Sequence, residues 1–463
     1  MISTVRRGRY GAGRIARGVL AVTLLAAVTG AASVPAMAKD APAAAPKIVL
    51  SAKFQPAYVA FTKAMDAAKA SPAVTAAAAK LKAAQDGNDD AATKAAIAEL
   101  GATLADPKAK LDAAFAAATT ADDKYVAGQL AATQLGAFAS DPAIQLRGIN
   151  AMIDSGKASA DQLPQLNFFK GEFAYQQSDY PTAIAALKVA TAGGYHQNNA
   201  DVILAESLLD NKQIAEGLAA WKTVLTQAQT AGQPAQEGFY GHALQIAYDN
   251  QLKEQTLDFG RLMVSAYPSQ RNWNSTIGTT IAELEFKNPG EELDLLRLLG
   301  KAGKITQKGH LSEYIRVADP RALPNEVKSV IDQAVANGVI TVTDPSVSPS
   351  YQLANQRLPG ERAALPGYKK DLTSASANAA ALASDGDSYL AFGQYADAAA
   401  FYQAALGKAG VDADAVNTRL GIAQVGSGDF AGAQASFAKV TGASRGPIAQ
   451  LWGIYAQQKA AGK

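Results

Sequence analysis

Residues 386–406 read GDSYLAFGQYADAAAFYQAAL, and residues 421–441 read GIAQVGSGDFAGAQASFAKVT. The two stretches share glycines, an alanine and an aromatic residue at an offset of 35 residues, in the pairs 386/421, 393/428, 398/433 and 402/437. A second pair of stretches, starting at Gly171 and Ala205, repeats at an offset of 34 residues. Two independent pairs with nearly one period predict a repeated structural unit.

Each recurrent residue has a physical role in a unit made of two helices. A small residue in the first helix leaves room for a close crossing, and an alanine in the second helix faces it. The small residues are Gly171, Ala205, Gly386 and Gly421, and the facing alanines are Ala183, Ala398 and Ala433. Gly393 and Gly428 fall where the first helix must end, and a positive φ there costs glycine least. The aromatic residues Trp221, Tyr402 and Phe437 are expected to fill the seam against the next unit.

These residues give the chain a resemblance to the tetratricopeptide repeat (TPR) family, whose unit is a 34-residue helical hairpin. The matches are Leu382-x2-Asp385-Gly386-x2-Tyr389 with Ala398-x3-Tyr402, and Leu420-Gly421 with Ala433-x3-Phe437. The resemblance implies an all-α fold, an α-solenoid of stacked antiparallel helical hairpins. It also implies a binding surface on the concave side of the solenoid, lined by the first helix of each unit.

The pattern along the chain predicts six segments. They are a signal peptide (1–38), a flexible lead (39–53), an Ala-rich helical region (54–160), TPR-like helical repeats (161–338), a Pro-rich connector (339–371) and a C-terminal TPR pair with a capping helix (372–463). The connector is predicted because residues 339–371 contain four prolines and no helical stripe, with a short strand at 339–343 as an alternative for its start.

The first 38 residues have the layout of an export signal. Five arginines precede an apolar run, and Ala36-x-Ala38 follows as a cleavage site. Arg6-Arg7 also allows the twin-arginine route, but Gly8 and Arg9 stand where bulky apolar residues are expected, which favours the general secretory route. The apolar run is short for a membrane-spanning helix. We therefore expect cleavage after Ala38 and a periplasmic protein without an integral membrane anchor.

Composition and spacing argue against several kinds of chemistry. The signal holds five of the 43 basic residues and none of the 41 acidic ones, so its removal leaves a net charge of −3, which does not favour nucleic-acid binding. The chain has no cysteine, and its three histidines lie far apart, so neither a metal nor a cofactor is expected. The acid pairs Asp385/Asp387 and Asp412/Asp414 lie beside expected helix starts, where capping is the simpler interpretation than glycosidase catalysis.

The repeats at 171 and 205 predict a partner-binding groove with acidic and aromatic side chains. If these units follow the TPR geometry, its lining residues are Phe168, Glu172, Tyr175, Gln176, Asn199, Glu206 and Asp210. Such a groove would suit a peptide that carries Lys or Arg. The alternatives are that a neighbouring segment fills the groove or that the acids form a solvated face.

The leading functional hypothesis is a non-enzymatic periplasmic scaffold or adaptor that binds envelope proteins or peptides through a concave groove. A second hypothesis is an enzyme or enzyme subunit of cell-wall or polysaccharide metabolism, built on a helical superhelix like that of soluble lytic transglycosylases. A third is an oligomerising structural component of the envelope. The sequence does not identify the partner.

Overall fold

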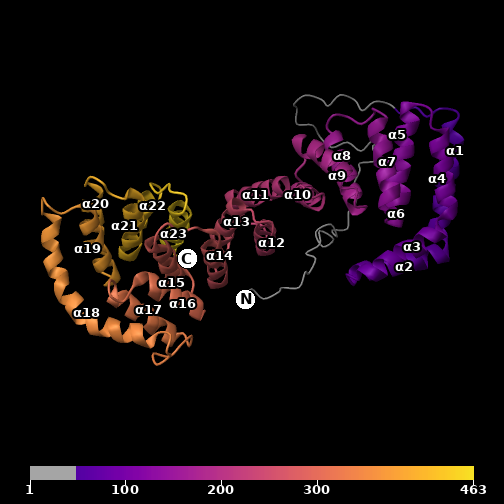
Figure 1. The fold of residues 1–463 in the computed structure, drawn as a ribbon. Coiled ribbons are helices and arrows are strands. Elements are labelled where there is room, and N and C mark those ends of the chain that lie inside the picture. Colours follow the sequence, from indigo (N-terminus) through magenta and orange to yellow (C-terminus); the bar gives the residue numbers. More distant parts are fainter. Residues whose placement is uncertain (1–47, 463) are drawn as a thin grey trace. The chain divides into compact units, whose positions relative to one another are not determined.

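The computed structural model of the chain describes residues 48–462, and every regular element among them is a helix (Figure 1). The all-α prediction is therefore confirmed for the described residues. The predicted signal peptide, and residues 39–47 of the predicted lead, lie outside them. The described chain divides into two compact units, residues 48–224 and 225–462. This boundary falls inside the segment 161–338, which the repeat period treats as a single run.

Unit 1 contains the Ala-rich helices and the first repeat pair. Its elements are α1 (Phe54–Ala70), α2 (Pro72–Asp86), α3 (Asp90–Thr103), α4 (Ala105–Ala117), α5 (Ala121–Gln129), the π-helix η2 (Leu130–Gly136), α6 (Ala137–Ala139), α7 (Pro142–Asp154), α8 (Leu163–Gln176), α9 (Tyr180–Ala192), α10 (Ala200–Asp210) and the first part of α11 (Ile214–Thr230).

Neighbouring helices of unit 1 pack in pairs, α1 with α4, α2 with α3, α5 with α7 and α8 with α9. The sequence fixes several of the helix starts. Asp141 accepts hydrogen bonds from Ala143 N (3.0 Å) and Ile144 N (3.2 Å), with Pro142 in the first turn of α7. Thr120 and Asp123 form a reciprocal capping box at the start of α5. A short polar residue before an apolar run therefore marks these helix starts.

Unit 2 contains the remaining helices. They are α12 (Glu237–Asp249), α13 (Lys253–Ala266), α14 (Gln270–Glu283), α15 (Pro289–Ala302), α16 (Lys308–Ala318), α17 (Pro324–Ala336), α18 (Ser348–Tyr368), the 3₁₀ helix η3 (Lys369–Leu372), α19 (Ala379–Ala391), α20 (Tyr395–Leu406), α21 (Ala413–Ser427), α22 (Phe430–Phe437) and α23 (Arg445–Ala460). Consecutive helices pack on one another, and α23 returns to contact α13, α15 and α21.

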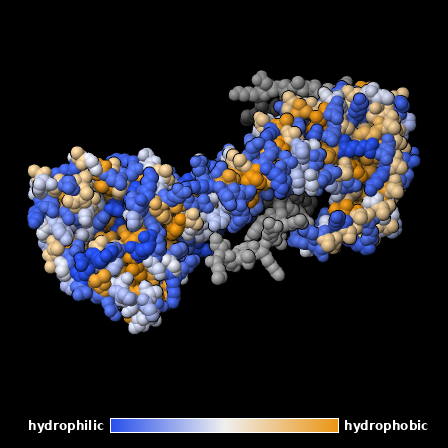
Figure 2. Space-filling model, viewed as in Figure 1, coloured by the Kyte–Doolittle hydropathy of each residue, from blue (hydrophilic) through white to orange (hydrophobic). Residues whose placement is uncertain are grey.

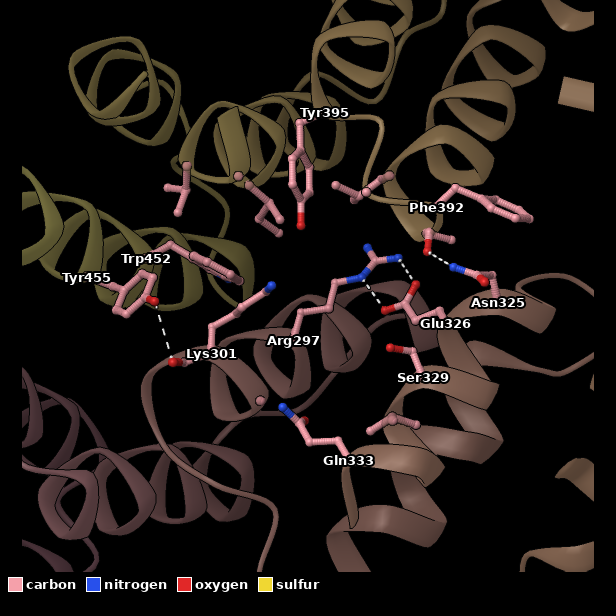
Figure 3. A pocket seen from close by; sticks show the side chains of 18 of the residues that line it. Arg297, Lys301, Asn325, Glu326, Ser329, Gln333, Phe392, Tyr395, Trp452 and Tyr455 are labelled. Carbon is pink, nitrogen blue, oxygen red and sulfur yellow. Dashed lines mark hydrogen bonds and ion pairs between the residues drawn. The ribbon is translucent and has the colours of Figure 1, made fainter. Parts of the chain in front are cut away.

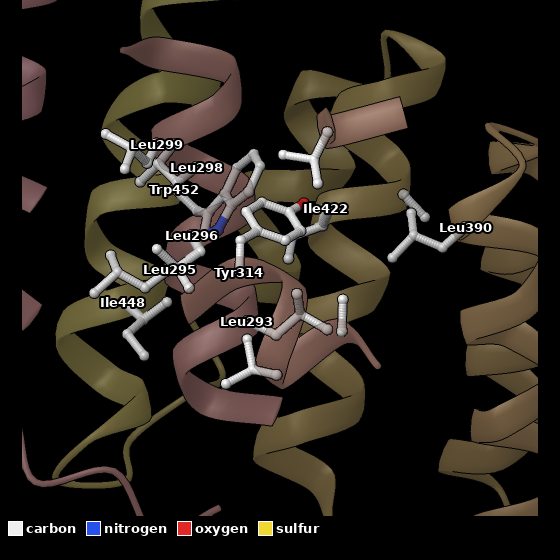
Figure 4. Packing of buried hydrophobic residues seen from close by; sticks show 14 of the residues in the cluster. Leu293, Leu295, Leu296, Leu298, Leu299, Tyr314, Leu390, Ile422, Ile448 and Trp452 are labelled. Carbon is white, nitrogen blue, oxygen red and sulfur yellow. The ribbon is translucent and has the colours of Figure 1, made fainter. Parts of the chain in front are cut away.

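Helix α15 is the centre of unit 2, because it is buried on all sides from Glu291 to Leu299. Its run LDLLRLL places leucines around the whole helix, and Figure 4 shows them packed with Tyr314, Ile422 and Trp452. A helix that is apolar all round is expected inside a helical domain. The segment predicted as a terminal capping helix, α23, packs on this core with buried Ile448, Trp452 and Tyr455. It therefore covers the interior of unit 2.

The prediction of a non-helical connector at 339–371 was wrong for most of its length. Residues 348–368 form α18, which packs between α17 and α19, and residues 339–347 contain no strand. Pro349 lies in the first turn, where a missing N–H costs nothing. Pro359 and Pro366 lie inside the helix, and only Ala354 and Leu365 are buried. An exposed helix can leave its freed carbonyls to water, which is why the prolines do not break it here.

The recurrent glycines lie at helix crossings inside each hairpin. A Cβ atom added at Gly171 would lie 2.5 Å from Leu187 Cγ, one at Gly386 would lie 2.7 Å from Tyr402 Cε1, and one at Gly421 would lie 2.6 Å from Phe437 Cζ. Each partner comes sixteen residues after its glycine. Tyr402 and Phe437 therefore pack over the glycine of their own hairpin, and the prediction that they fill the seam between hairpins was wrong.

The same sixteen-residue relation recurs outside the predicted pairs. A Cβ atom added at Gly260 of α13 would lie 3.0 Å from Thr276 Cγ2 of α14. Gly393 and Gly428 have φ of +69° and +83°, so glycine ends the first helix in both C-terminal hairpins. Figure 2 shows hydrophilic surface over much of the described chain, with smaller hydrophobic patches between. Among the described residues, no helix has both the length and the apolar character needed to cross a bilayer.

Candidate functional site

The residues predicted to line a groove in unit 1 divide into a buried set and an exposed set. Phe168, Glu172 and Glu206 are 0%, 2% and 7% exposed, so they belong to the interior. Phe168 stacks on Tyr195, with ring centroids 4.9 Å apart. The groove prediction was wrong for these three residues, because the unit closes over them.

The other four predicted groove residues remain accessible. Gln176, Asn199 and Asp210 are exposed, and Tyr175 is half-buried with its hydroxyl 3.1 Å from an Asp210 carboxylate oxygen. Burial and the charge of Asp210 raise the pKa of Tyr175 above its ordinary value. Of the three acids predicted to line the groove, only Asp210 is therefore accessible to a partner.

Glu172 is a buried acid in unit 1 whose Oε2 has no hydrogen-bond partner. Burial raises the pKa of Glu172 to about 7. Glu206 differs, because its Oε1 accepts a 2.8 Å hydrogen bond from Trp221 Nε1. The aligned position in the C-terminal hairpin is similar, since Asp387 Oδ1 accepts a 2.7 Å bond from Tyr402. In both hairpins, the aromatic residue donates a hydrogen bond to an acid that lies fifteen residues before it in the sequence.

Unit 2 contains a cavity of about 540 Å³ between α15, α17, α21, α23 and the turn that joins α19 to α20. A pocket of this size matches those that hold small ligands or a few side chains of a partner. Its apolar wall includes Leu390, Phe392, Ile422 and Val425. Leu390 comes from α19, and Ile422 and Val425 come from α21, the first helices of the two C-terminal hairpins. Helices α15 and α23 both pack on α21.

The polar wall of the cavity carries side chains that point inward (Figure 3). The ammonium group of Lys301 and the hydroxyl of Tyr395 enter from different helices, and Ser329 and Gln333 extend from α17 toward the same space. No residue in the described part of the chain pairs with these four side chains. Tyr455 donates a 3.5 Å hydrogen bond to the carbonyl oxygen of Lys301, which fixes the end of α15. The cavity therefore offers several hydrogen-bond donors to a ligand.

The base of the cavity is a buried ion pair. Arg297 donates from Nε and Nη2 to the two carboxylate oxygens of Glu326, at 2.8 and 2.7 Å. Tyr314 donates a third bond to Glu326, at 2.7 Å. Burial alone would raise the pKa of Glu326, but the charge of Arg297 lowers it below its ordinary value. This acid is therefore ionised and fully occupied, so it does not serve as a free acid or base.

The ion pair is part of a larger buried network around Asp294, which is 0% exposed. Its carboxylate accepts hydrogen bonds from Arg297 (2.9 Å) and Arg445 (2.8 Å). Arg419 Nε lies 3.5 Å from Asp294, and its Nη1 bonds Asp387 at 2.7 Å. Burial opposes the ionised form of Asp294, yet the three guanidinium groups lower the pKa of its carboxyl. The network joins α15, α17, α19, α21 and α23.

The repeat pattern does not predict this network or the cavity above it. The signal was present, because LDLLRLL contains an acid and a base one turn apart inside a run of leucines. Charges on a buried helix must find partners, so such a pair predicts further charged residues elsewhere in the chain. Which distant residues supply them, here Arg419 and Arg445, depends on tertiary packing that the repeat pattern does not specify.

Three of the four acids considered for catalysis have structural partners, and Asp385 and Asp387 lie inside α19 and not beside a helix start as the sequence suggests. Asp412 caps α21 by accepting from Ala415 N (3.0 Å), and Asp414 accepts from Gly442 N (2.7 Å). Asp387 belongs to the buried network, whereas Asp385 lies away from it with a pKa raised to about 6 by burial and by nearby Asp371 and Glu361. Among residues 48–462, no cluster of three or more His, Asp or Glu side chains is arranged to hold a metal ion.

A scan against protein-family models finds no match to this chain, and a search of curated proteins finds no significantly similar sequence.

Proposed function

We propose that the protein is an adaptor of the TPR-like α-solenoid type, exported to the periplasm, that binds a segment of another envelope protein. The observation that supports this proposal most directly is the cavity of unit 2. Its wall combines apolar side chains with inward-pointing hydrogen-bond donors that have no partner in the described chain. Buried apolar anchors and a few placed polar groups are what a protein interface uses for affinity and orientation.

The repeated hairpins support this proposal independently. The sixteen-residue contact between a small residue and its partner occurs in α8/α9, α13/α14, α19/α20 and α21/α22. Stacked hairpins of this kind provide an extended scaffold for recognition. The buried network also fixes the helices around the cavity, which reduces the entropy lost when a partner binds.

A photocrosslinking experiment in cells that naturally produce the protein tests this function. A photoreactive residue replaces Gln333, which is exposed at the cavity, and a control replaces Gln356, which is exposed on α18 away from it. The proposal expects a discrete protein adduct at position 333 and none at 356. Equal adducts at both positions, or no adduct at 333, would contradict it. Release of soluble fragments from purified peptidoglycan by the purified protein would favour the enzyme hypothesis instead.

A further inference from the structure

The charges around the unit 2 cavity are not balanced. Four ionisable groups with a charge at neutral pH line it, namely Arg297, Lys301, Glu326 and Lys459. Arg297 and Glu326 neutralise each other through their two short hydrogen bonds. Lys301 and Lys459 have no carboxylate within ion-pair distance in the described chain, although Lys459 lies over the Tyr455 ring at 5.4 Å. The cavity therefore has an excess of two positive charges.

The donors in the wall fit an anion better than a neutral or cationic group. The hydroxyls of Ser329 and Tyr395 can donate hydrogen bonds to an oxyanion, with Lys301 as its counter-charge. Hydrogen bonds that involve an ionised group are stronger than neutral ones. The one carboxylate in the lining, Glu326, is occupied by Arg297 and Tyr314, so it does not repel an incoming anion as a free acid would.

The apolar part of the lining favours a peptide over a saccharide. Sugar rings bind best on an open aromatic face, but Trp452 is 1% exposed and Tyr455 is 9% exposed, and the partly exposed Tyr395 enters the cavity with its hydroxyl foremost. The Trp452 and Tyr455 rings pack edge to face, with centroids 5.9 Å apart. Leu390, Ile422 and Val425 instead offer an aliphatic wall to a side chain such as leucine or phenylalanine. Glutamate or aspartate beside such a residue would fill both parts of the cavity.

From this geometry we infer that the cavity binds an acidic peptide segment, with a Glu or Asp carboxylate at Lys301 and a neighbouring apolar side chain against α19 and α21. The inference rests on the proposed adaptor function and names the chemical class of its partner. Lys301 supplies the charge, and Tyr395 and Ser329 orient the carboxylate, while the exposed Gln333 lies beside them and serves as the crosslinking position.

Fluorescence anisotropy with the full chain tests the inference. The probes are three labelled peptides with blocked ends, GELEFEG, GQLQFQG and GKLKFKG. The glutamate peptide should bind at least about tenfold more tightly than the glutamine peptide, and its affinity should fall with added salt. The lysine peptide should not bind. Equal affinity for the glutamate and glutamine peptides, or no binding of either, would overturn the inference.

Matched lysine variants locate the binding charge. Lys301→Gln should weaken binding of the glutamate peptide by about threefold to tenfold, because it removes one exposed charge contact. Lys304→Gln removes the same charge from an exposed position outside the cavity lining and should leave affinity unchanged. Equal losses in both variants would overturn the assignment of Lys301. Binding of polygalacturonate that depends on Lys301, without peptide binding, would replace the peptide by an acidic saccharide.

The crosslinking experiment separates the inference from the function on which it rests. Adducts at position 333 that persist unchanged in the Lys301→Gln background would retain the adaptor function and reject the acidic partner. Adducts that Lys301→Gln diminishes, while Lys304→Gln preserves them, would support both.

Discussion

At the scale of single residues, Glu172 makes the stability of unit 1 depend on pH. Its carboxyl is buried and its pKa is raised to about 7, so the folded state keeps a proton that the unfolded chain loses near 4.5. Between these two values the folded state binds more protons, and stability falls as the pH rises. Above pH 7 the folded state bears the full free-energy cost of ionising this buried carboxyl, about 3 kcal/mol.

Glu172→Gln should therefore stabilise unit 1 at pH 8 by up to about 3 kcal/mol, and the gain should shrink toward pH 4.5. Urea unfolding of both proteins at several pH values measures it. Glu99→Gln is the matched control, because Glu99 is half-exposed in a surface pair with Lys80 and should change stability little. Parallel pH profiles for Glu172→Gln and the parent protein would show that this carboxyl ionises without penalty.

A second residue-scale prediction concerns the helix crossings. A Cβ atom at Gly421 would collide with the Phe437 ring, so Gly421→Ala should destabilise unit 2 by about 1–3 kcal/mol through overpacking. Gly453→Ala is the control, since nothing lies within 4 Å of its Cβ position in the middle of α23. That substitution should stabilise by up to about 1 kcal/mol through helix propensity. Thermal unfolding compares the two variants. Stability changes of the same sign would contradict the close helix crossing at Gly421.

The spacing of small residues correctly predicted the positions of the close helix crossings. Each crossing needs a small side chain, and this need is local and recurs in every unit. It did not predict which side chains point to solvent. Phe168, Glu172 and Glu206 were assigned to a groove from family geometry, yet they are buried. Exposure depends on whether a further layer covers a helix, and the sequence of one hairpin does not contain that information.

At the scale of helices, α18 shows how proline misleads a sequence-based assignment. Four prolines suggested a connector, although Pro349 starts the helix and only Pro359 and Pro366 interrupt its hydrogen bonding. Besides the solvation of its freed carbonyls, α18 is held by contacts with α19. Tyr389 donates a hydrogen bond to the Leu365 carbonyl, and Ser388 donates one of 2.9 Å to Glu361. These contacts come from α19, which the periodicity of α18 itself cannot indicate.

Pro359→Ala should strengthen α18, because it restores a backbone donor and removes a ring that crowds the preceding turn. The expected gain is up to about 3 kcal/mol for opening of this helix. Hydrogen exchange of peptides covering 350–365 should slow, while peptides from α8 and α9 should exchange at the parent rate. Faster exchange in 350–365 would mean that the helix needs the bend that Pro359 provides.

At the scale of the whole molecule, the two units have separate cores. The large apolar cluster of unit 2 extends from Leu257 to Ala456, and the clusters of unit 1 lie between Phe54 and Ile203. The repeat period predicted helical pairs in both units but not the end of unit 1, because a period describes neighbours along the chain and not where a core closes. In unit 2, buried charged side chains join helices that are distant in the sequence. Arg445 and Asp294 are 151 residues apart in sequence.

Asp294→Asn should destabilise unit 2 by about 3–5 kcal/mol, because it leaves the buried guanidinium groups of Arg297 and Arg445, and the partly exposed one of Arg419, with one fewer negative charge. Asp332→Asn is the control, since it removes the charge of a partly exposed pair with Lys328 and leaves an amide oxygen that can still accept the hydrogen bond from Tyr351. It should cost at most about 1 kcal/mol. Hydrogen exchange resolves the effect by unit. Residues 289–302 and 413–427 should lose protection in Asp294→Asn, and residues 163–192 should keep it because they belong to a different core. Loss of protection in both units would show that the chain unfolds as one cooperative body, and full protection in unit 2 would show that its arginines are held without Asp294.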